Sequence, residues 1–531
     1  MKKLYLIILL GCLCATTFSQ TKIFREVGQD ISTSVKPIME HDILVGYLAF
    51  TQLEKLDKDS FSYRITIMDE NLNDIGVVNF HEQKLRLEDV MIEDNILCLA
   101  YVKSNVLGYT YEHRATRKKA FRSGKAWMFT QFINLKGEII KTAQLSLDVD
   151  IAGNWNPDFI PGSVLKEPVR VQNISGKGFV CFYGDDSKKN MVFYDMNGEN
   201  TWEKRISEAG DIVHFMTSDH DVYLVTKKEE SATKYQYTVH SYNADDKSTY
   251  PKYILKDKKG NNLLALGFEN DPVSGKPDIS GLIYNPKFRK PMNKDEGLKI
   301  RRGMYGGVFN IQLNGHKKGE IKEQFTYWYD ESKSNVTAKG YFESGDGYIT
   351  PNKSFRDFYG NTYYTGSVIN SNVRGSSIAW NVIGWGLIGA RLALFASNPL
   401  VGAAVAPGLA LSKYRSFPAG SALVMKMDSI GKLKYENTLP VKGRIQRGGY
   451  NYYLGAYCFT VVSSVDRRTY LIMADEKAYV IYSMEQKKVI RTIKRDDNGK
   501  SVTVLPAKEG SIIVSTVNAK EKYTMMSVEA I

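Results

Sequence analysis

The chain has 531 residues, of which 43% are hydrophobic and 12% aromatic, and a formal net charge of +13. This apolar content excludes a disordered chain, and the length exceeds what one ordinary hydrophobic core needs, so we expect several domains or one large repetitive domain. The basic excess suits an anionic partner, such as a membrane surface or a polyanion, but does not identify one.

Residues 1–19 predict a bacterial-type secretory signal peptide. Lys2 and Lys3 provide the positive start, residues 4–10 are apolar, and Thr17-Phe18-Ser19 has the small-x-small pattern of a cleavage site. We expect cleavage between Ser19 and Gln20. The mature protein is then expected in the periplasm, the cell envelope or the extracellular space.

The same segment leaves one alternative open. Residues 9–12 (Leu-Leu-Gly-Cys) have the order of a lipobox, which predicts a lipoprotein attached at Cys12. Against this, the residues after Cys12 stay apolar, where a lipoprotein normally continues with a polar tether. The apolar stretch from Leu4 to Ala15 is too short for the roughly 30 Å of hydrocarbon in a bilayer, so it does not predict a membrane span.

The mature part predicts a unit of four short strands that recurs along the chain. In the clearest copy, Ile212–Phe215 and Val222–Val225 precede Tyr235–Ser241 and Tyr250–Leu255, with turns rich in Asp and Asn between them. Short strands separated by turn residues, with almost no helical periodicity, indicate an all-β fold. In chain order the copies cover residues 33–80, 87–145, 169–206, 211–255, 263–328, 348–439, 457–493 and, with only three strands, 502–531.

Four-stranded units repeated in this way are typical of the blades of a β-propeller. We expect a single domain over residues 20–531 with eight blades, and seven blades as the alternative. The last unit lacks its fourth strand, and residues 21–27, directly after the signal peptide, can supply it. The two ends of the chain would then close the ring.

One hairpin carries a family resemblance. The run Asp195-x-x-Gly198-x-x-x-Trp202 resembles the outer hairpin of quinoprotein-type blades and comes close to the Asp box of sialidases. It occurs once, so no activity of either family is carried over. Over nearly the whole mature chain, the strand pattern is similar to that of secreted bacterial β-propeller-like proteins of unknown function. That resemblance implies the fold and no particular reaction.

Three units carry a long insertion, and each insertion falls between the second and third strands. Because antiparallel strands alternate in direction, all three insertions are expected on the same face of the propeller. Two of them are basic, and the third, within residues 370–420, is apolar and rich in Gly and Ala. The basic candidates are Arg114, Arg117, Lys118, Lys119 and Arg122 in the first insertion, and Lys287, Arg289, Lys290, Arg301 and Arg302 in the second.

The apolar insertion predicts a helical hairpin. Residues 378–396 are interrupted only by Asn381 and Arg391 as strongly polar side chains, and Asn398-Pro399 separates them from a second apolar stretch. As a helix the first stretch would be about 28 Å long, near the hydrocarbon thickness of a bilayer. Dipping into a membrane, plugging the propeller channel and forming an oligomer interface remain open alternatives. The candidate contact residues are Trp380, Trp385, Leu387, Ile388, Leu392 and Phe395.

No pattern of catalytic or cofactor chemistry stands out. Gly384-x-Gly386-x-x-Gly389 lacks the strand–turn–helix context of a dinucleotide site, and there is no His-x-x-x-His pair for zinc. In the oxygen-rich segment 148–158, Ala152 occupies a position where a calcium loop needs a ligand. We therefore expect no cofactor, no metal, no nucleic-acid partner and no catalytic residues, although carboxylates brought together by the fold would leave no sequence motif.

The leading hypothesis is a non-catalytic exported protein that binds an anionic membrane surface or envelope polymer. It would do so through the basic and apolar loops of one propeller face, since charge and apolar burial together strengthen peripheral membrane binding. A first alternative is a protein-interaction scaffold or oligomer that uses the apolar hairpin as its interface. A second alternative is a propeller hydrolase with carboxylates in its channel. The sequence indicates neither the ligand nor the oligomeric state.

Overall fold

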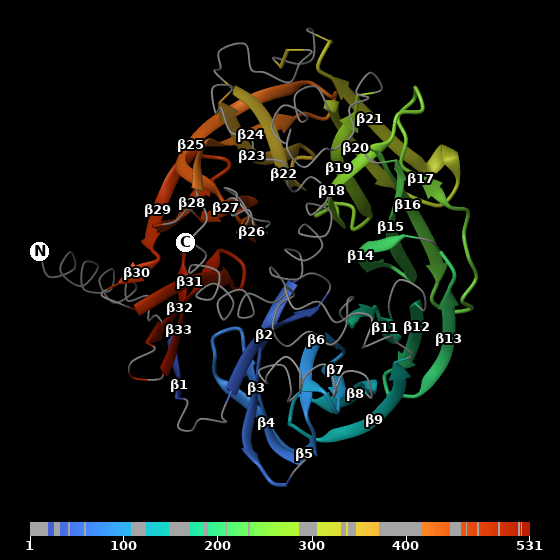
Figure 1. Cartoon of the computed structure of the whole chain (residues 1–531), viewed down its shortest axis with the longest axis vertical. Helices are drawn as coiled ribbons and strands as arrows, with labels where there is room; N and C mark the ends of the chain where they lie inside the picture. The colour runs from blue at the N-terminus through green and yellow to red at the C-terminus, as the bar shows by residue number, and fades with distance from the viewer. Residues whose placement is uncertain are drawn as a thin grey trace, which may run out of the picture.

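Eight antiparallel sheets form a ring around a central axis in the computed structural model of the chain (Figure 1). Seven sheets have four strands, and one has five because the two-residue strand β30 joins its inner side. The fold is therefore an all-β, eight-bladed β-propeller of four-stranded blades, and the seven-blade alternative is wrong. The structure describes residues 20–25, 32–40, 43–57, 60–107, 124–147, 169–184, 189–208, 210–231, 234–285, 305–330, 336–337, 347–370, 416–446, 458–463, 465–474, 477–497, 500–518, 521 and 523–531.

In each blade the first strand lies nearest the centre and the fourth lies at the rim (Figure 1). Blades 1 and 2 comprise β2 (Ser32–Glu40), β3 (Ile43–Lys55), β4 (Ser60–Asp69) and β5 (Asp74–Gln83), then β6 (Leu85–Glu93), β7 (Ile96–Ser104), β8 (Ala126–Asn134) and β9 (Ile139–Leu147). Blades 3 and 4 comprise β10 (Arg170–Ile174), β11 (Gly178–Gly184), β12 (Lys189–Asp195) and β13 (Asn200–Ile206), then β14 (Asp211–Ser218), β15 (Asp221–Ser231), β16 (Lys234–Asn243) and β17 (Tyr253–Ile254).

The second half of the ring follows the same plan. Blades 5 and 6 comprise β18 (Leu263–Asn270), β19 (Pro277–Tyr284), β20 (Tyr305–Leu313), the short 3-10 helix η2 (Lys318–Glu320) and β21 (Ile321–Tyr327), then β22 (Gly347–Arg356), β23 (Thr362–Asn370), β24 (Ser416–Met427) and β25 (Leu433–Gln446). Blades 7 and 8 comprise β26 (Cys458–Ser463), β27 (Arg468–Ala474), β28 (Ala478–Ser483) and β29 (Lys488–Lys494), then β30 (Asp496–Asp497), β31 (Lys500–Pro506), β32 (Ser511–Asn518), β33 (Tyr523–Ala530) and β1 (Gln20–Arg25).

The hydrophobic core lies between neighbouring blades. Every residue of β11 and of β19 is buried, because strands inside a blade are covered on both faces. Strand β9 at the rim instead alternates exposed and half-buried residues. Aromatic rings join one blade to the next. For example, Phe132 of blade 2 lies 6.0 Å from Phe179 and 5.2 Å from Tyr194 of blade 3, measured between ring centroids.

The N-terminal strand completes the last blade. Strand β1 pairs antiparallel with β33, from Gln20 opposite Val528 to Arg25 opposite Tyr523. The fourth strand of the last unit is therefore supplied from the segment that the sequence indicated. Lys22 also forms a 2.5 Å ion pair with Asp74 of blade 1, so β1 connects the last blade to the first.

One strand is much shorter than the sequence predicts. Strand β17 is confined to Tyr253–Ile254, whereas Tyr250–Leu255 was expected. Pro251 has no backbone N–H and therefore cannot continue a regular ladder. The chain stays alongside β16 through two separate bonds, because the N–H groups of Tyr250 and Leu255 donate to the carbonyls of Ser241 and Tyr237.

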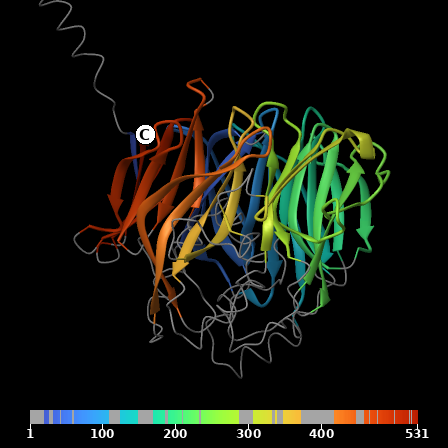
Figure 2. The same ribbon diagram turned by 90° about the horizontal axis from the view of Figure 1, so that it is seen from above.

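The alternation of strands gives the ring two different faces. The turns joining first to second and third to fourth strands lie on one side, which we call the turn face; it is the upper side in Figure 2. The loops joining second to third strands, and the connections to the next blade, lie on the other side, which we call the insertion face. Strand β1 starts on the turn face at Gln20, and the C-terminal Ile531 also lies there, where its N–H donates to the carbonyl of Gly510.

Candidate functional site

The structure describes the strand ends that hold the three insertions. The ten basic candidates between Arg114 and Arg302, the six apolar candidates between Trp380 and Phe395, and the expected helical hairpin lie outside the described residues. The strand ends all belong to the insertion face, in blade 2, blade 5 and blade 6. Blade 2 lies across the ring from the other two (Figure 1). The flanking residues are Ser104 and Ala126, Tyr284 and Tyr305, and Asn370 and Ser416.

The base of the first basic insertion is fixed by hydrogen bonds. Ser104 donates its hydroxyl to the carbonyl of Lys125 at 2.7 Å, and the N–H of Lys125 donates to the side chain of Asn105 at 2.9 Å. Ser104 and Ala126 also face each other in the β7–β8 ladder. The two ends of this insertion therefore leave the ring side by side.

The insertion face also presents lysines and tyrosines that the structure describes. The connection from blade 4 to blade 5 turns at Asp257, whose carboxylate accepts a 2.9 Å hydrogen bond from the hydroxyl of Tyr327. Lys259, in the same turn, holds its Nζ 4.8 Å from the ring centroids of both Tyr327 and Tyr329. Tyr329 is 56% exposed, so an aromatic ring and an ammonium group meet the solvent together.

The turns share a construction that the sequence encodes locally. In six turns of the described residues the Oδ1 atom of an Asp or Asn accepts hydrogen bonds from the backbone N–H groups two and four residues later, which mimics a backbone turn. The anchoring residues are Asp69, Asn134, Asp195, Asp257, Asp357 and Asp428.

The hairpin that resembled quinoprotein blades follows this rule. Asp195 anchors the turn, and Gly198 has a φ of +75°. A Cβ on Gly198 would lie 2.4 Å from the ring of Phe132 in blade 2, so the position requires glycine. Trp202 donates its indole N–H to the carbonyl of Ala244 in blade 4 at 2.7 Å. The motif thus serves contacts between blades.

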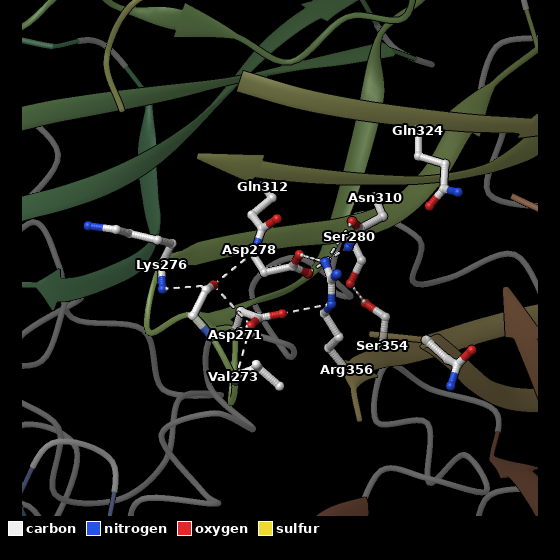
Figure 3. Close-up of polar contacts among 12 residues, drawn as sticks. Asp271, Val273, Lys276, Asp278, Ser280, Asn310, Gln312, Gln324, Ser354 and Arg356 are labelled. Atoms are coloured by element: carbon white, nitrogen blue, oxygen red, sulfur yellow. Dashed lines mark hydrogen bonds and ion pairs between the residues drawn. The ribbon is translucent and has the colours of Figure 1, made fainter. Parts of the chain in front are cut away.

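A buried ionic cluster joins the turn faces of blades 5 and 6 (Figure 3). Arg356, at the end of β22, holds Nη1 2.7 Å from Oδ2 of Asp278 and 3.2 Å from Oδ1 of Asn310. Its Nε lies 2.7 Å from Oδ2 of Asp271 in an ion pair that lacks hydrogen-bond geometry. Asn310 in turn donates to Oδ1 of Asp278 at 2.6 Å. The side chains of Asp271 and Asp278 are only 4% and 3% exposed.

Burial dominates the electrostatics of this cluster. It raises the pKa of Asp278 from 3.8 to about 6, although Arg356 and Asn310 favour the ionised form and oppose the change. Two carboxylates therefore share one guanidinium in a site from which water is largely excluded. One guanidinium compensates only one of the two negative charges, and these ion pairs connect blade 5 to blade 6.

Side chains of the inner strands bond to the backbone of the next blade. Lys36 of β2 donates to the carbonyl of Glu88 in β6 at 2.5 Å, and Asp89 of β6 accepts from the N–H of Val171 in β10 at 2.9 Å. Burial lowers the pKa of Lys36 to about 8, although Asp89 and Glu88 raise it, and burial raises the pKa of Asp89. These buried charges satisfy the free inner edges of neighbouring sheets.

Within the part of the chain that the structure describes, no group of three or more His, Cys, Asp or Glu side chains is placed to hold a metal ion. The same residues include no helix long and apolar enough to cross a membrane. The acidic segment 148–158 and the apolar stretch 378–396 fall in the gaps between the described ranges.

Sequence reasoning missed the cluster around Arg356. Asp271 and Asp278 flank a turn, and the local pattern Asp-Pro-Val-Ser-Gly indicates nothing more than that turn. Their partner Arg356 comes from the next blade, so no spacing in the sequence could have joined the three.

Comparison with known families gives one match. Residues 1–122 match the model of DUF6770, a family of unknown function. The match covers less than a quarter of the chain and attaches no activity to it. None of the curated proteins matches the chain.

Solved structures resemble the chain in fold. The Dos1 propeller is 7% identical with a TM-score of 0.44, over 96% of this chain and 95% of the other. The WD40 domain of SCAP from fission yeast is 9% identical with a TM-score of 0.38, over 96% and 98% of the two chains. The β-propeller domain of the Trilobed protease from Pyrococcus furiosus is 7% identical with a TM-score of 0.34, over 84% and 97%. At these identities the likeness concerns the propeller fold alone.

Proposed function

We propose that the chain is an exported, non-catalytic binding protein that engages an anionic membrane surface through its insertion face. The observation that carries the proposal is the position of the strand ends in blades 2, 5 and 6. All three long insertions leave from the same face of the ring, two of them rich in Lys and Arg and the third apolar. The pattern of residues 1–19 supports the exported part of the proposal.

The described part of this face supports the same partner. Lys259 lies against Tyr327 and Tyr329, and Lys258 beside it is exposed. Tyrosine is enriched where a membrane meets water, since its ring is apolar and its hydroxyl is polar. Each Lys or Arg near an anionic bilayer contributes about 1 kcal/mol of binding free energy, so the summed contribution of the two basic insertions exceeds that of any single residue. The apolar insertion would add burial below the headgroups.

The test is flotation of the chain from Gln20 onward with vesicles of anionic or zwitterionic lipid. We expect flotation with the anionic vesicles only, and less of it at high salt, because salt screens exposed charges. Deleting residues 376–411 should weaken flotation, and so should the substitutions Arg301→Glu and Arg302→Glu. A matched control makes the same change of charge on the turn face, with Lys136→Glu and Lys247→Asp, and should float like the parent chain.

Equal flotation of the parent, the deletion and the Arg301/Arg302 variant would contradict the proposal, and so would the absence of flotation with every vesicle. A soluble anionic polysaccharide or teichoic-acid-like polymer serves as a second probe. Binding of that polymer without flotation would replace the membrane by an envelope polymer as the partner.

A further inference from the structure

The turn face is divided into two halves of opposite charge. Its exposed charged side chains are mainly acidic over blades 1–4 and mainly basic over blades 5–8. Among the described residues of blades 1–4 they are Asp74, Asp94, Glu138, Glu199, Asp219, Asp245 and Asp246, with Lys136 and Lys247 as the basic exceptions. Four of these acids form ion pairs with less exposed lysines: Asp74 with Lys22, Glu199 with Lys141, Asp219 with Lys276 and Asp245 with Lys177. On blades 5–8 the exposed charged side chains are Lys317, Lys318, Lys432, Arg467, Arg468, Lys487 and Lys488, with Glu320, Asp466, Glu485 and Glu509 as the acidic exceptions.

The basic half also exposes apolar side chains at the tips of its turns. Val273 is 67% exposed in blade 5, Tyr359 is 59% and Ile430 77% in blade 6, and Val465 is 90% in blade 7. In the anchored turns of blades 1–3, the residue two positions after the anchor is polar: Asn71, Lys136 and Asn197. Tyr359 and Ile430 occupy the same position after Asp357 and Asp428. The construction of the turn does not require an apolar residue there.

These tips are held in place before any partner arrives. The Oδ1 atom of Asp271 accepts from the N–H groups of Val273 and Ser274 at 3.0 and 2.7 Å, and Oδ2 of the same carboxylate pairs with Arg356 (Figure 3). Asp357, only 3% exposed, accepts from the N–H of Tyr359 at 2.9 Å. A surface fixed in this way loses little conformational entropy when it binds.

We propose that the turn face is a self-association surface, on which two copies of the chain dock face to face with two-fold symmetry and the basic half of each covers the acidic half of the other. The two-fold axis lies in the plane of the turn face. It runs from the boundary between blades 4 and 5 to the boundary between blades 8 and 1. Rotation about this axis lays blade 7 on blade 2 of the second copy, and blade 5 on blade 4. A two-fold contact of this kind requires a self-complementary surface, which the two halves provide.

The blade 7–blade 2 contact gives a specific test. It brings the outer turn of blade 7, with Lys487 and Lys488, opposite Glu138 in the outer turn of blade 2 of the second copy. The inner turn of blade 7, with Arg467 and Arg468, comes opposite Asp94 in the inner turn of blade 2. The basic-side variant is Lys487→Asn with Lys488→Glu, and the acidic-side variant is Asp94→Asn with Glu138→Lys. Asn is used at positions 487 and 94 because both have positive φ, 53° and 46°, which Asn tolerates. Lysine already stands at the position equivalent to Glu138 in the Asp428 turn, as Lys432.

Sedimentation velocity on the folded chain from Gln20 onward measures the association. The parent should form a species of twice the chain mass that dissociates at high salt. Each variant alone should associate about tenfold more weakly or worse, since like charges would face each other at both copies of the contact. An equimolar mixture of the two variants should associate again, because each then meets the opposite charge.

Two results would overturn the proposal. A parent chain that stays monomeric at every concentration reached would show that the turn face does not mediate self-association. A dimer that neither variant weakens would place the contact elsewhere. Unchanged thermal unfolding of both variants shows that any loss of association comes from the surface, since all four side chains are exposed. The vesicle experiment tests the insertion face, so either proposal can be contradicted without affecting the other.

Discussion

Replacing Arg356 by Met should destabilise the propeller strongly at pH 8 and less at pH 5. Among the described residues the guanidinium is the only cationic group that forms an ion pair with the carboxylates of Asp271 and Asp278, and both carboxylates are almost fully buried. Removing one partner of a buried ion pair typically costs about 3–5 kcal/mol, because the remaining charge is left without compensation.

The dependence on pH follows from Asp278. Its pKa in the folded chain is about 6, above the ordinary 3.8, so the protonated form is the one the fold favours. This contribution to stability is fully present below 3.8 and is lost as pH rises through 6. Without Arg356 the pKa should rise further, so at pH 5 the carboxyl is neutral and the cost of the substitution shrinks.

Thermal unfolding followed by circular dichroism checks this. With an unfolding entropy of about 2.1 cal/mol/K per residue, a cooperative domain of this length loses about one degree of Tm per kcal/mol, so we expect Tm to fall by about 3–5 °C at pH 8. Adding Asp278→Asn to the Arg356→Met variant removes one of the stranded charges and should recover part of that loss. A fall of less than one degree, or an equal fall at pH 5 and pH 8, would refute the reasoning.

Two further substitutions address other contacts between blades. Lys36→Met should abolish a rise in the free energy of unfolding that we expect of the parent chain between pH 8 and 10.5. The pKa of Lys36 in the folded chain is about 8, below its ordinary 10.5, so the folded state favours the neutral amine. A parent chain whose urea midpoint is flat over that range would contradict this. Trp202→Phe should cost about 1–3 kcal/mol in urea unfolding, since it deletes the 2.7 Å hydrogen bond to Ala244 and leaves a buried carbonyl without its donor; stability equal to that of the parent would show that water replaces the indole.

Much of the fold was predictable because its signals are local. Strand residues alternate or run apolar over short segments, and Asp or Asn followed by Gly, as in Asp195 to Gly198 and Asp428 to Gly431, marks the turns between outer strands. The incomplete last unit indicated a strand near Thr21, and β1 fills that place. Strand β17 was predicted too long, because the effect of Pro251 on the ladder was overlooked.

The contacts that hold blades together were not predictable in the same way. Arg356 meets Asp271 and Asp278 across a boundary between blades, and Lys36 meets Glu88 across another. Such pairs depend on the rotation of one sheet against the next, which single-sequence periodicity does not encode. The charge difference between the halves of the turn face likewise requires knowing which turns share a side of the ring.

The starting point of β1 bears on the choice between a cleaved and a lipid-modified N-terminus. Gln20 lies on the turn face, and the eight peptide units back to Cys12 span about 28 Å at most. A lipid at Cys12 would anchor the ring to a membrane by its turn face, which carries Val273 and Arg467. The insertion face would then point away from that membrane. For the lipid and the insertions to enter the same bilayer, the chain between Cys12 and Gln20 would have to run fully extended along the rim of blade 8. Attachment through a lipid at Cys12 and attachment through the insertions therefore orient the ring in opposite directions relative to the membrane.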